Sequence, residues 1–365
     1  MKEDLTGLPP RGASRAGSTG KVDRWLLARL LREVRARAPL PMDQPPGVGV
    51  DVGGVRIRGG ILLATVDPLY VMPEVEWGEA TWFSFHSLAG DMATSGIPPQ
   101  FLLLDLNLPP GTHANTIRAI VRGFRRAAHA SRTTLLGGHT GRYAHCSFPM
   151  VGSGTVLSVA PPGGFVTTRM ARPGHRILGV GPVGLEAAWL LAIHQEEAVE
   201  RCLGVGGYRH LRQRTRELTV LPTALESAKV GLGPSGVSAM HDASEGGVLG
   251  AVWDIAEASH ADVELDRTSP PVEPDVGRVL DTFHLNPLTA SSQGVLLVCV
   301  HPSRVPSLAR RMSRLGRKTF SVGSVGQRST GKPRVRRGGV LVGPPGPDEI
   351  GRWISSEGSS GAALR

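Results

Sequence analysis

Met240-His241-Asp242-Ala243-Ser244-Glu245-Gly246-Gly247 is the stretch of this chain that says most about its fold. It combines a histidine, two carboxylates and a glycine pair directly before residues with the apolar spacing of a helix. Acidic side chains and bare backbone amides at the start of a helix suit a metal ion that carries a phosphate chain. The stretch alone also allows a plainer interpretation, in which Asp242 only caps the helix.

Further clusters of glycine and aspartate in the first half of the chain strengthen the first interpretation. They are Asp51 in the glycine-rich segment 47–54, Asp67 after an apolar run, Asp91 next to Gly90, and Gly137-Gly138-His139-Thr140. Magnesium prefers oxygen ligands and shares them with phosphate oxygens. Glycine lets backbone amides approach a phosphate without a Cβ atom in the way. The clusters together predict a magnesium and phosphate site assembled from separate segments.

Length and composition favour two domains in a reducing compartment. The chain has 365 residues, enough for two cores, and its 48 glycines and 29 prolines are typical of many tight loops. Its three cysteines are scattered and odd in number, so we expect no disulfide framework, no zinc cluster and a cytoplasmic location. No apolar run reaches the roughly 18 residues that span a bilayer, and the N-terminus lacks the apolar core of a signal peptide.

The net charge of +10 raises the possibility of nucleic-acid binding, but its distribution argues against it. Residues 1–45 hold nine Lys or Arg against five Asp or Glu, and residues 327–365 hold seven against three. Both ends therefore carry most of the excess, and no recognisable nucleic-acid module accompanies it. We expect residues 1–20 to be disordered and residues 327–365 to form a flexible basic tail.

Apolar periodicity predicts alternating strands and helices, which is typical of an α/β fold. Strands are expected at 61–66, 101–108, 133–136, 148–159, 176–180, 261–265, 294–300 and 317–323. Helices are expected at 24–37, 79–95, 112–131, 185–202, 248–259 and 303–315, the first of them capped by Asp23. Pro161–Gly164 predicts a joint between an N-terminal domain at 21–160 and a C-terminal domain at 165–326.

Two helices are expected to turn one face inward. The inward side chains are Trp25, Leu27, Leu30, Leu31 and Val34 in the first helix, and Trp82, Phe85, Ala89 and Met92 in the second.

Two glycine motifs match the dinucleotide-binding pattern literally, at 179–184 and 231–236. The first follows a predicted strand, but the acid that should end the next strand falls near Glu200, at the end of the same predicted helix. The second has no strand before it. We therefore do not expect nicotinamide or flavin binding.

Seven segments in register, between about residues 21 and 326, resemble one known superfamily. They are Gly49–Gly53, Val66-Asp67-Pro68, Gly90–Pro99, Gly137–Thr140, Pro173-Gly174-His175 with Gly184-Leu185-Glu186, Met240–Gly247, and Asn286-Pro287-Leu288 with Ser291–Gly294. The order resembles that of the aminoimidazole ribonucleotide (AIR) synthase, or PurM-like, superfamily. The fifth and sixth segments resemble those that open and line its second domain. The branch most similar to the chain is that of the hydrogenase maturation factor HypE.

The resemblance implies a PurM-like two-domain α/β (α+β) fold, in which the N-terminal sheet forms a barrel across a homodimer and the C-terminal domain is an α/β sandwich. It also implies ATP and Mg²⁺ as cofactors near the domain junction. The implied metal ligands are Asp51, Asp67 and Asp91. The implied nucleotide contacts are Gly49, Asp51, Gly53, Gly137, Gly138, His139, Thr140, Gly246 and Gly247. The implied catalytic residues are Glu245, His241 and Asp242, with Glu245 and His241 facing the acceptor.

The activity implied is ATP- and Mg²⁺-dependent phosphorylation of an oxygen on a small amide, carbamoyl or phosphate-type substrate, with or without a later dehydration or amination. Three departures from the superfamily pattern, at Val50, Gly90 and Asn286, leave a second hypothesis open: a non-catalytic member that binds a nucleotide or a partner. A small-molecule kinase similar to thiamine-monophosphate kinase is a third. Because the last residues include no cysteine, we do not expect hydrogenase maturation of the HypE kind.

Overall fold

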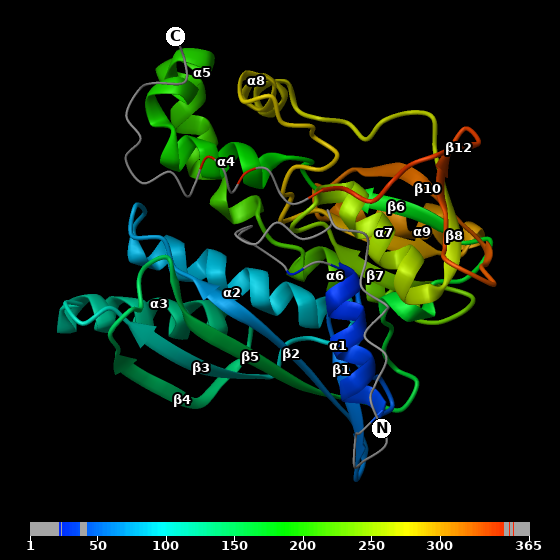
Figure 1. The fold of residues 1–365 in the computed structure, drawn as a ribbon, viewed down its shortest axis with the longest axis horizontal. Helices are drawn as coiled ribbons and strands as arrows, with labels where there is room; N and C mark the ends of the chain where they lie inside the picture. The colour runs from blue at the N-terminus through cyan, green and yellow to red at the C-terminus, as the bar shows by residue number, and fades with distance from the viewer. Residues whose placement is uncertain (1–21, 23, 37–41, 347–349, 351–352, 354–365) are drawn as a thin grey trace, which may run out of the picture.

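The computed structural model describes residues 22, 24–36, 42–346, 350 and 353, and the predictions of disorder at 1–20 and of a cap at Asp23 lie outside them. The described chain forms two β-sheets with helices packed between and around them (Figure 1). The first sheet uses residues from the N-terminal half and the second uses residues from the C-terminal half. None of the described helices has both the length and the apolar character needed to cross a membrane.

The first sheet has five strands in the order β1-β2-β5-β3-β4. Their bounds are Gly53–Ile57, Gly60–Tyr70, Met150–Ala160, Phe101–Leu108 and Thr134–Arg142. Neighbours are antiparallel except for β3 and β4, which are parallel and joined through a helix. The side chains of β3 alternate between buried and half-buried, which is the pattern of a strand with one face on a core. The predicted bounds of β3 are confirmed.

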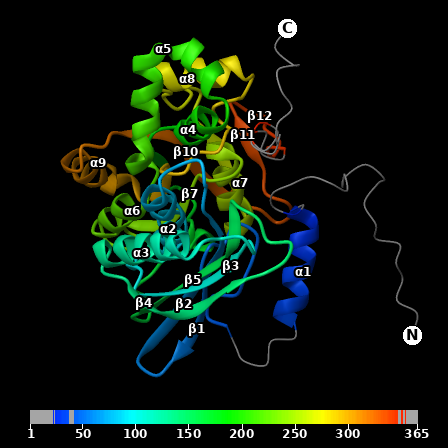
Figure 2. The same ribbon diagram turned by 90° about the vertical axis from the view of Figure 1, so that its left-hand side faces the viewer.

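One face of this sheet is covered by α2 (Trp77–Thr94) and α3 (Ala114–Ala130), as Figure 2 shows from the side. Helix α2 is apolar nearly all round and is buried on every side, as expected for a helix inside a protein. The expected inward residues Phe85, Ala89 and Met92 are fully buried. Trp82 is only half-buried, because it lies at the boundary with the second half, stacked on His86.

The second sheet has seven strands in the order β12-β11-β8-β10-β6-β9-β7. Its main strands are β6 (Arg176–Val180), β7 (Val237–Asp242), β8 (Ala261–Leu265), β9 (Leu296–Val300) and β10 (Thr319–Arg328). All five residues of β9 are buried, because both faces of the sheet are covered. Leu297 and Cys299 pack with α7 (Gly247–Ser259), whereas Leu296 and Val298 join the core that contains α2.

The remaining helices surround this second sheet and the top of the molecule. They are α4 (Leu185–His194), α5 (Glu196–Arg212), α6 (Leu221–Ala228), α8 (Pro274–Thr282) and α9 (Val305–Arg314), with short 3₁₀ turns at Thr168–Met170, Gln213–Glu217 and Pro302–Arg304. The single helix expected at 185–202 is two helices, because the backbone of Gln195 leaves the helical region. The sequence did not predict α6 or α8.

Helix α1 (Arg24–Ala36) forms as predicted, but its apolar face is only partly covered by the described chain, with Leu27 and Leu31 half-buried. Leu30 and Val34, which we expected to face the core, are 46 % and 56 % exposed. Figure 2 shows α1 at the side of the molecule, clear of α2 and α3.

Three further expectations need correction. Gly137–Thr140 is not a loop after a short strand but the middle of β4. The first part of the opening motif, through Asp242, is the end of strand β7. The predicted basic tail includes two strands, β11 (Val335–Arg337) and β12 (Val340–Leu341), of which β11 pairs in parallel with β8. Val335 is fully buried, so this apolar residue is anchored despite its charged neighbours.

Candidate functional site

Four carboxylates from distant parts of the chain converge where the two halves meet. Asp51 lies just before β1, Asp67 within β2, Asp91 in the last turns of α2, and Asp242 at the end of β7. Asp67 and Asp91 share a hydrogen bond. Burial, and then the negative charges of Asp67, Asp242 and Asp51, raise the pKa of Asp91 well above its ordinary value. The cluster is therefore crowded with negative charge and is suited to a cation.

Two threonine hydroxyls orient these carboxylates. Thr65 on β2 donates to Oδ2 of Asp91 at 3.3 Å. Thr94, at the end of α2, donates to the backbone carbonyl of Asp91 at 2.7 Å and lies 3.5 Å from Oδ2 of Asp51. Asp51 and Asp91 are thus tied to the same turn of α2, although they lie 40 positions apart in the sequence.

His241 lies between two carboxylates and uses both of its ring nitrogens. Nδ1 is 2.8 Å from Oδ2 of Asp51, and Nε2 is 3.2 Å from Oδ2 of Asp254 on α7. Burial lowers the pKa of His241, but the two flanking carboxylates raise it well above its ordinary value. In this structure His241 is a buried group whose two ring nitrogens contact Asp51 and Asp254, and its role in facing the acceptor stays a prediction.

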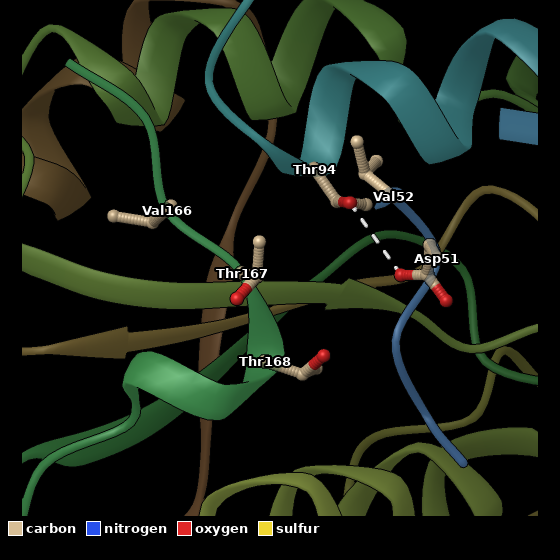
Figure 3. Close-up of a pocket in the computed structure, with 6 residues that line it drawn as sticks. All are labelled: Asp51, Val52, Thr94, Val166, Thr167 and Thr168. Carbon is tan, nitrogen blue, oxygen red and sulfur yellow. Dashed lines mark hydrogen bonds between the residues drawn. The ribbon is translucent and has the colours of Figure 1, made fainter. Parts of the chain in front are cut away.

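A narrow crevice lies beside Asp51 (Figure 3). It is lined by Asp51, Val52, Thr94, Val166, Thr167 and Thr168. The last three belong to the segment that connects the two halves, and this segment is pinned by a hydrogen bond from Thr168 to the carbonyl of Gly49. The hydroxyl of Thr167 and Nε of Arg169 are buried, and neither has a hydrogen-bond partner among the described residues. Thr167 is the one of these two donors that lines the crevice, whereas the guanidinium of Arg169 is directed to the carbonyls of Pro45 and Pro46.

The glycines of the two motifs allow close backbone approach. Gly246 and Gly247 adopt positive φ angles of 77° and 59° in the turn from β7 into α7. A Cβ atom on Gly247 would lie 2.5 Å from the carbonyl oxygen of Ala290, so this turn requires glycine. At the other motif, a Cβ atom on Gly49 would lie 2.6 Å from Cβ of Asp254. Glu245 is exposed at the same turn, apart from the buried pair His241 and Asp242.

The tetrapeptide Gly137–Thr140 does not join the carboxylates within one chain. Register places Asp67 opposite Gly154, Gly154 opposite Leu104, and Leu104 opposite Gly138. Three strand spacings separate the first residue from the last, a distance of roughly 14 Å. His139 instead contacts the hydroxyl of Tyr143 on the exposed edge. Gly53, expected to contact nucleotide, is the first residue of β1.

The residues present fit a divalent cation. Ligand atoms of Asp51, His241 and Asp242 lie within 4.8 Å of one another. Because the nitrogens of His241 are both engaged, the carboxylate oxygens are the donors that remain, and oxygen donors suit Mg²⁺.

The sequence identified all four carboxylates of the cluster but missed groups that hold them, which are Thr65, Thr94 and Asp254. It also missed Thr167 in the crevice and the neighbouring Arg169. Only Asp254 had a visible signal, as the one acid among apolar residues in Gly247–Ala256. Threonines and arginines are too common in strands and connections to stand out.

Two family models match the chain in tandem. Residues 49–159 match the N-terminal domain of AIR synthase related proteins, and residues 172–336 match the C-terminal domain. A curated relative, carbamoyl dehydratase HypE of Rhodobacter capsulatus, is 26 % identical over 335 residues, which are 88 % of this chain and 90 % of that protein.

Solved structures share the fold. The structure of Aquifex aeolicus thiamine monophosphate kinase complexed with AMPPCP and TMP superposes with a TM-score of 0.68 and 19 % identity, covering 89 % of this chain and 96 % of that one. The hydrogenase maturation protein HypE of E. coli superposes with a TM-score of 0.67 and 21 % identity, covering 90 % and 98 %. The PurM-like fold expected from the sequence is confirmed, and the chain belongs to the AIR synthase related proteins.

Proposed function

We propose that this protein is an ATP-dependent enzyme that binds ATP with Mg²⁺ at the four-carboxylate cluster and phosphorylates an oxygen of a small amide, carbamoyl or phosphate-type substrate. The observation that carries the proposal is the convergence of Asp51, Asp67, Asp91 and Asp242 at the junction of the two halves, where Asp242 is buried and the other three are half-buried. Such a concentration of negative charge is unfavourable unless cations occupy it. Cations there attract the polyphosphate chain of a nucleotide.

The similarity to known proteins supports the proposal that this protein binds ATP. The relative that is named a carbamoyl dehydratase and the kinase structure complexed with AMPPCP, an ATP analogue, both share the fold. In this chain, the buried hydroxyl of Thr167, which lines the crevice beside Asp51, offers a hydrogen bond to a phosphate oxygen. The glycines at 49, 246 and 247 let the backbone approach closely.

The residues divide the work as follows. Asp51, Asp67, Asp91 and Asp242 would hold Mg²⁺, which when bound neutralises phosphate charge and aligns the phosphate with its acceptor. Thr65 and Thr94 fix the carboxylates, and His241 fixes Asp51. Glu245, exposed at the turn into α7, is proposed to contact the acceptor. Contacts from Gly53 and from Gly137–Thr140 to nucleotide remain predictions.

The turnover of ATP tests the proposed function. The purified protein is incubated with ATP, Mg²⁺ and a panel of amide, carbamoyl and phosphate substrates, and ADP, AMP and phosphate are measured. ADP indicates kinase-type transfer, whereas AMP indicates release of both terminal phosphates. Turnover that Asp91→Asn abolishes supports the proposal. ATP binding without turnover on any substrate favours the non-catalytic hypothesis, and no ATP binding at all rejects both.

We also propose a homodimer formed through the uncovered face of the first sheet. Helices α2 and α3 lie on the opposite face (Figures 1 and 2). Val66 and Val159 point away from these helices and are 62 % and 37 % exposed. Pairing this face with that of a second copy would bury the apolar side chains, and it is the barrel that the superfamily resemblance implies. A cytoplasmic location is part of the same proposal and accords with three free cysteines.

Light scattering after size-exclusion chromatography tests the dimer. Val66→Asp should convert the dimer to a monomer. The matched control is Val205→Asp, on the exposed side of α5, which should leave the dimer intact. A monomeric wild-type protein overturns this part of the proposal.

A further inference from the structure

A chain of alternating charges runs from helix α1 to the carboxylate cluster. Nη2 of Arg24 lies 2.6 Å from Oδ1 of Asp254. Oδ2 of the same carboxylate lies 3.2 Å from Nε2 of His241, whose Nδ1 lies 2.8 Å from Oδ2 of Asp51. Asp254 thus uses one oxygen toward α1 and the other toward the site. The last member of the chain is one of the four carboxylates proposed to bind metal.

Burial in this chain of charges increases from Arg24 to His241, and Asp51, the last member, is 16 % exposed. The side chain of Arg24 is 32 % exposed and that of Asp254 is 17 % exposed, whereas that of His241 is 6 % exposed. Ion pairs and charge-assisted hydrogen bonds are stronger where water is excluded. The contacts of His241 should therefore restrict its ring to one orientation, and through it the carboxylate of Asp51.

Backbone packing supports the same connection. The segment that carries Asp51 lies directly against α7, where the backbone of Gly49 approaches Asp254 so closely that a Cβ atom would overlap it. Asp254 is thus fixed from two sides, by this contact and by its own helix. A side chain held in this way can orient a neighbour without large loss of entropy.

Helix α1 is only partly covered by the described residues. Its side chains Leu30 and Val34 are 46 % and 56 % exposed, whereas Leu27 and Leu31 are half-buried. Arg24 contacts α7 at two places, with Asp254 and with Glu257, whose Oε2 is 3.0 Å from Nη2. Arg24 thus attaches α1 to α7 and also contacts Asp254, the residue that leads to the cluster.

We propose that Asp254 and Arg24 are positioning residues of the metal site: Asp254 holds His241 against Asp51, and Arg24 holds Asp254 from α1. The proposal rests on the proposed function for its consequence in metal binding. Partners in the shell around metal ligands typically change metal affinity about 10- to 100-fold when they are removed.

The experiment measures the Kd of Mn²⁺, by electron paramagnetic resonance, on the full-length protein without nucleotide. Asp254→Ala should raise the Kd about tenfold. Arg24→Ala should raise it about threefold, as expected for a partly exposed ion pair, and Arg24→Lys should restore it to within twofold of wild type. In the Asp254→Ala background, Arg24→Ala should have no further effect.

Two controls separate this role from simple docking of α1. Arg29→Ala removes an exposed cation of the same helix whose partner is Glu33, and it should leave the Kd unchanged. Glu257→Gln removes the negative charge of the other partner of Arg24 on α7 but not the path to His241, so it should also leave the Kd unchanged. If Asp254→Ala does not fold, Asp254→Asn replaces it. A Kd within twofold of wild type for a folded Asp254 variant overturns the proposal, as does an equal effect from Glu257→Gln.

Failure of the proposed function can be told apart from failure of this inference. If the wild-type protein binds no Mn²⁺, the metal site itself is rejected. The connection is then judged by urea unfolding of Arg24→Ala, Asp51→Asn and the double variant. A more than twofold departure from additivity in the unfolding constant supports coupling from α1 to Asp51, and additivity overturns it.

Discussion

The carboxylate cluster and the edge strand β4 are similar in sequence but different in the structure. Both are built around glycine and small polar residues, and both were expected to contact one ligand. The cluster is assembled from four segments and is buried or half-buried at each of its four residues, with Asp91 at its centre. Gly137–Thr140 is a continuous, exposed stretch two intervening strands away from Asp67. Residue types indicate the chemistry that is available, but sheet order decides which residues can act together.

The largest effect that we expect is a loss of ATP turnover in variants of the carboxylate cluster compared with a variant of β4. Asp51→Asn and Asp242→Asn should each lower ATP turnover by at least about 100-fold, because each removes a charged oxygen donor from the cluster. His139→Ala should lower it by less than about fivefold if β4 of the same chain is remote from the reaction. Steady-state kinetics with unchanged circular dichroism spectra provide the measurement. The opposite ranking would place the reaction at the edge strand, reached across the dimer.

A pair of glycines tests the placement of β4 itself. Gly138 has a φ of 148°, and a Cβ atom there would lie 1.8 Å from the carbonyl oxygen of Leu104 on β3. Gly138→Ala should therefore lower the free energy of unfolding by about 2–3 kcal/mol. A Cβ atom on Gly137 meets nothing within 4 Å, so Gly137→Ala should cost less than about 1 kcal/mol. Urea unfolding measures both, and equal costs would mean that β4 is not paired with β3 as described.

The buried centre of the cluster should limit stability when no cation is present. The pKa of Asp91 is raised above its unfolded value, so the contribution of this group to stability falls as the pH rises from the unfolded pKa through the folded one. Without divalent metal near pH 8, Asp91→Asn should raise Tm by roughly 1–2 °C, the change that about 1 kcal/mol produces in a cooperative unit of about 300 residues. Saturating Mg²⁺ should abolish that gain. A lower Tm for the metal-free variant would contradict the crowding of charge at this point.

The smallest expected effect concerns the crevice beside Asp51. Thr167→Val removes a buried hydroxyl without a described partner and should weaken ATP binding about three- to fivefold while leaving the metal-free Tm unchanged. Thr168→Val is the matched control, since this hydroxyl bonds to Gly49 and its loss should lower Tm. Calorimetric titration and thermal unfolding distinguish the two. A lower Tm for Thr167→Val with unchanged ATP affinity would assign it a purely structural role.

Much of the fold follows from periodicity in the sequence. The bounds of β3 and β8 agree with prediction to the residue. The side chains of β3 alternate between its two faces, and β8 follows the clear end of a helix. Prediction failed where partners override local character. Val335-Arg336-Arg337 is a charged stretch, yet it pairs with β8. The helix expected at 185–202 is interrupted at Gln195. This residue is neither glycine nor proline, so the sequence did not indicate the interruption.

The acidic residues of the site could be predicted from the sequence, but the contacts between them could not. Asp91 is next to Gly90, Asp51 lies between Gly49 and Gly53, and Asp242 precedes the pair Gly246-Gly247, so each stood out as an acid in a glycine-containing motif. The engagement of both nitrogens of His241 could not be predicted, because Asp254 lies 13 residues further on, in a helix whose orientation depends on the second sheet. The crevice wall at Val166–Thr168 lies in a connection, where composition carries little information about position.

The burial of α2 on every side has a consequence for how the protein folds. Its side chains pack on the first sheet through Leu88 and on the second half through Phe83, which touches Trp189. One continuous core therefore includes residues from both halves, although the family models divide the chain near residue 160. A chain cut between Pro161 and Gly164 would expose this helix, so the two halves are expected to fold and unfold as one cooperative unit.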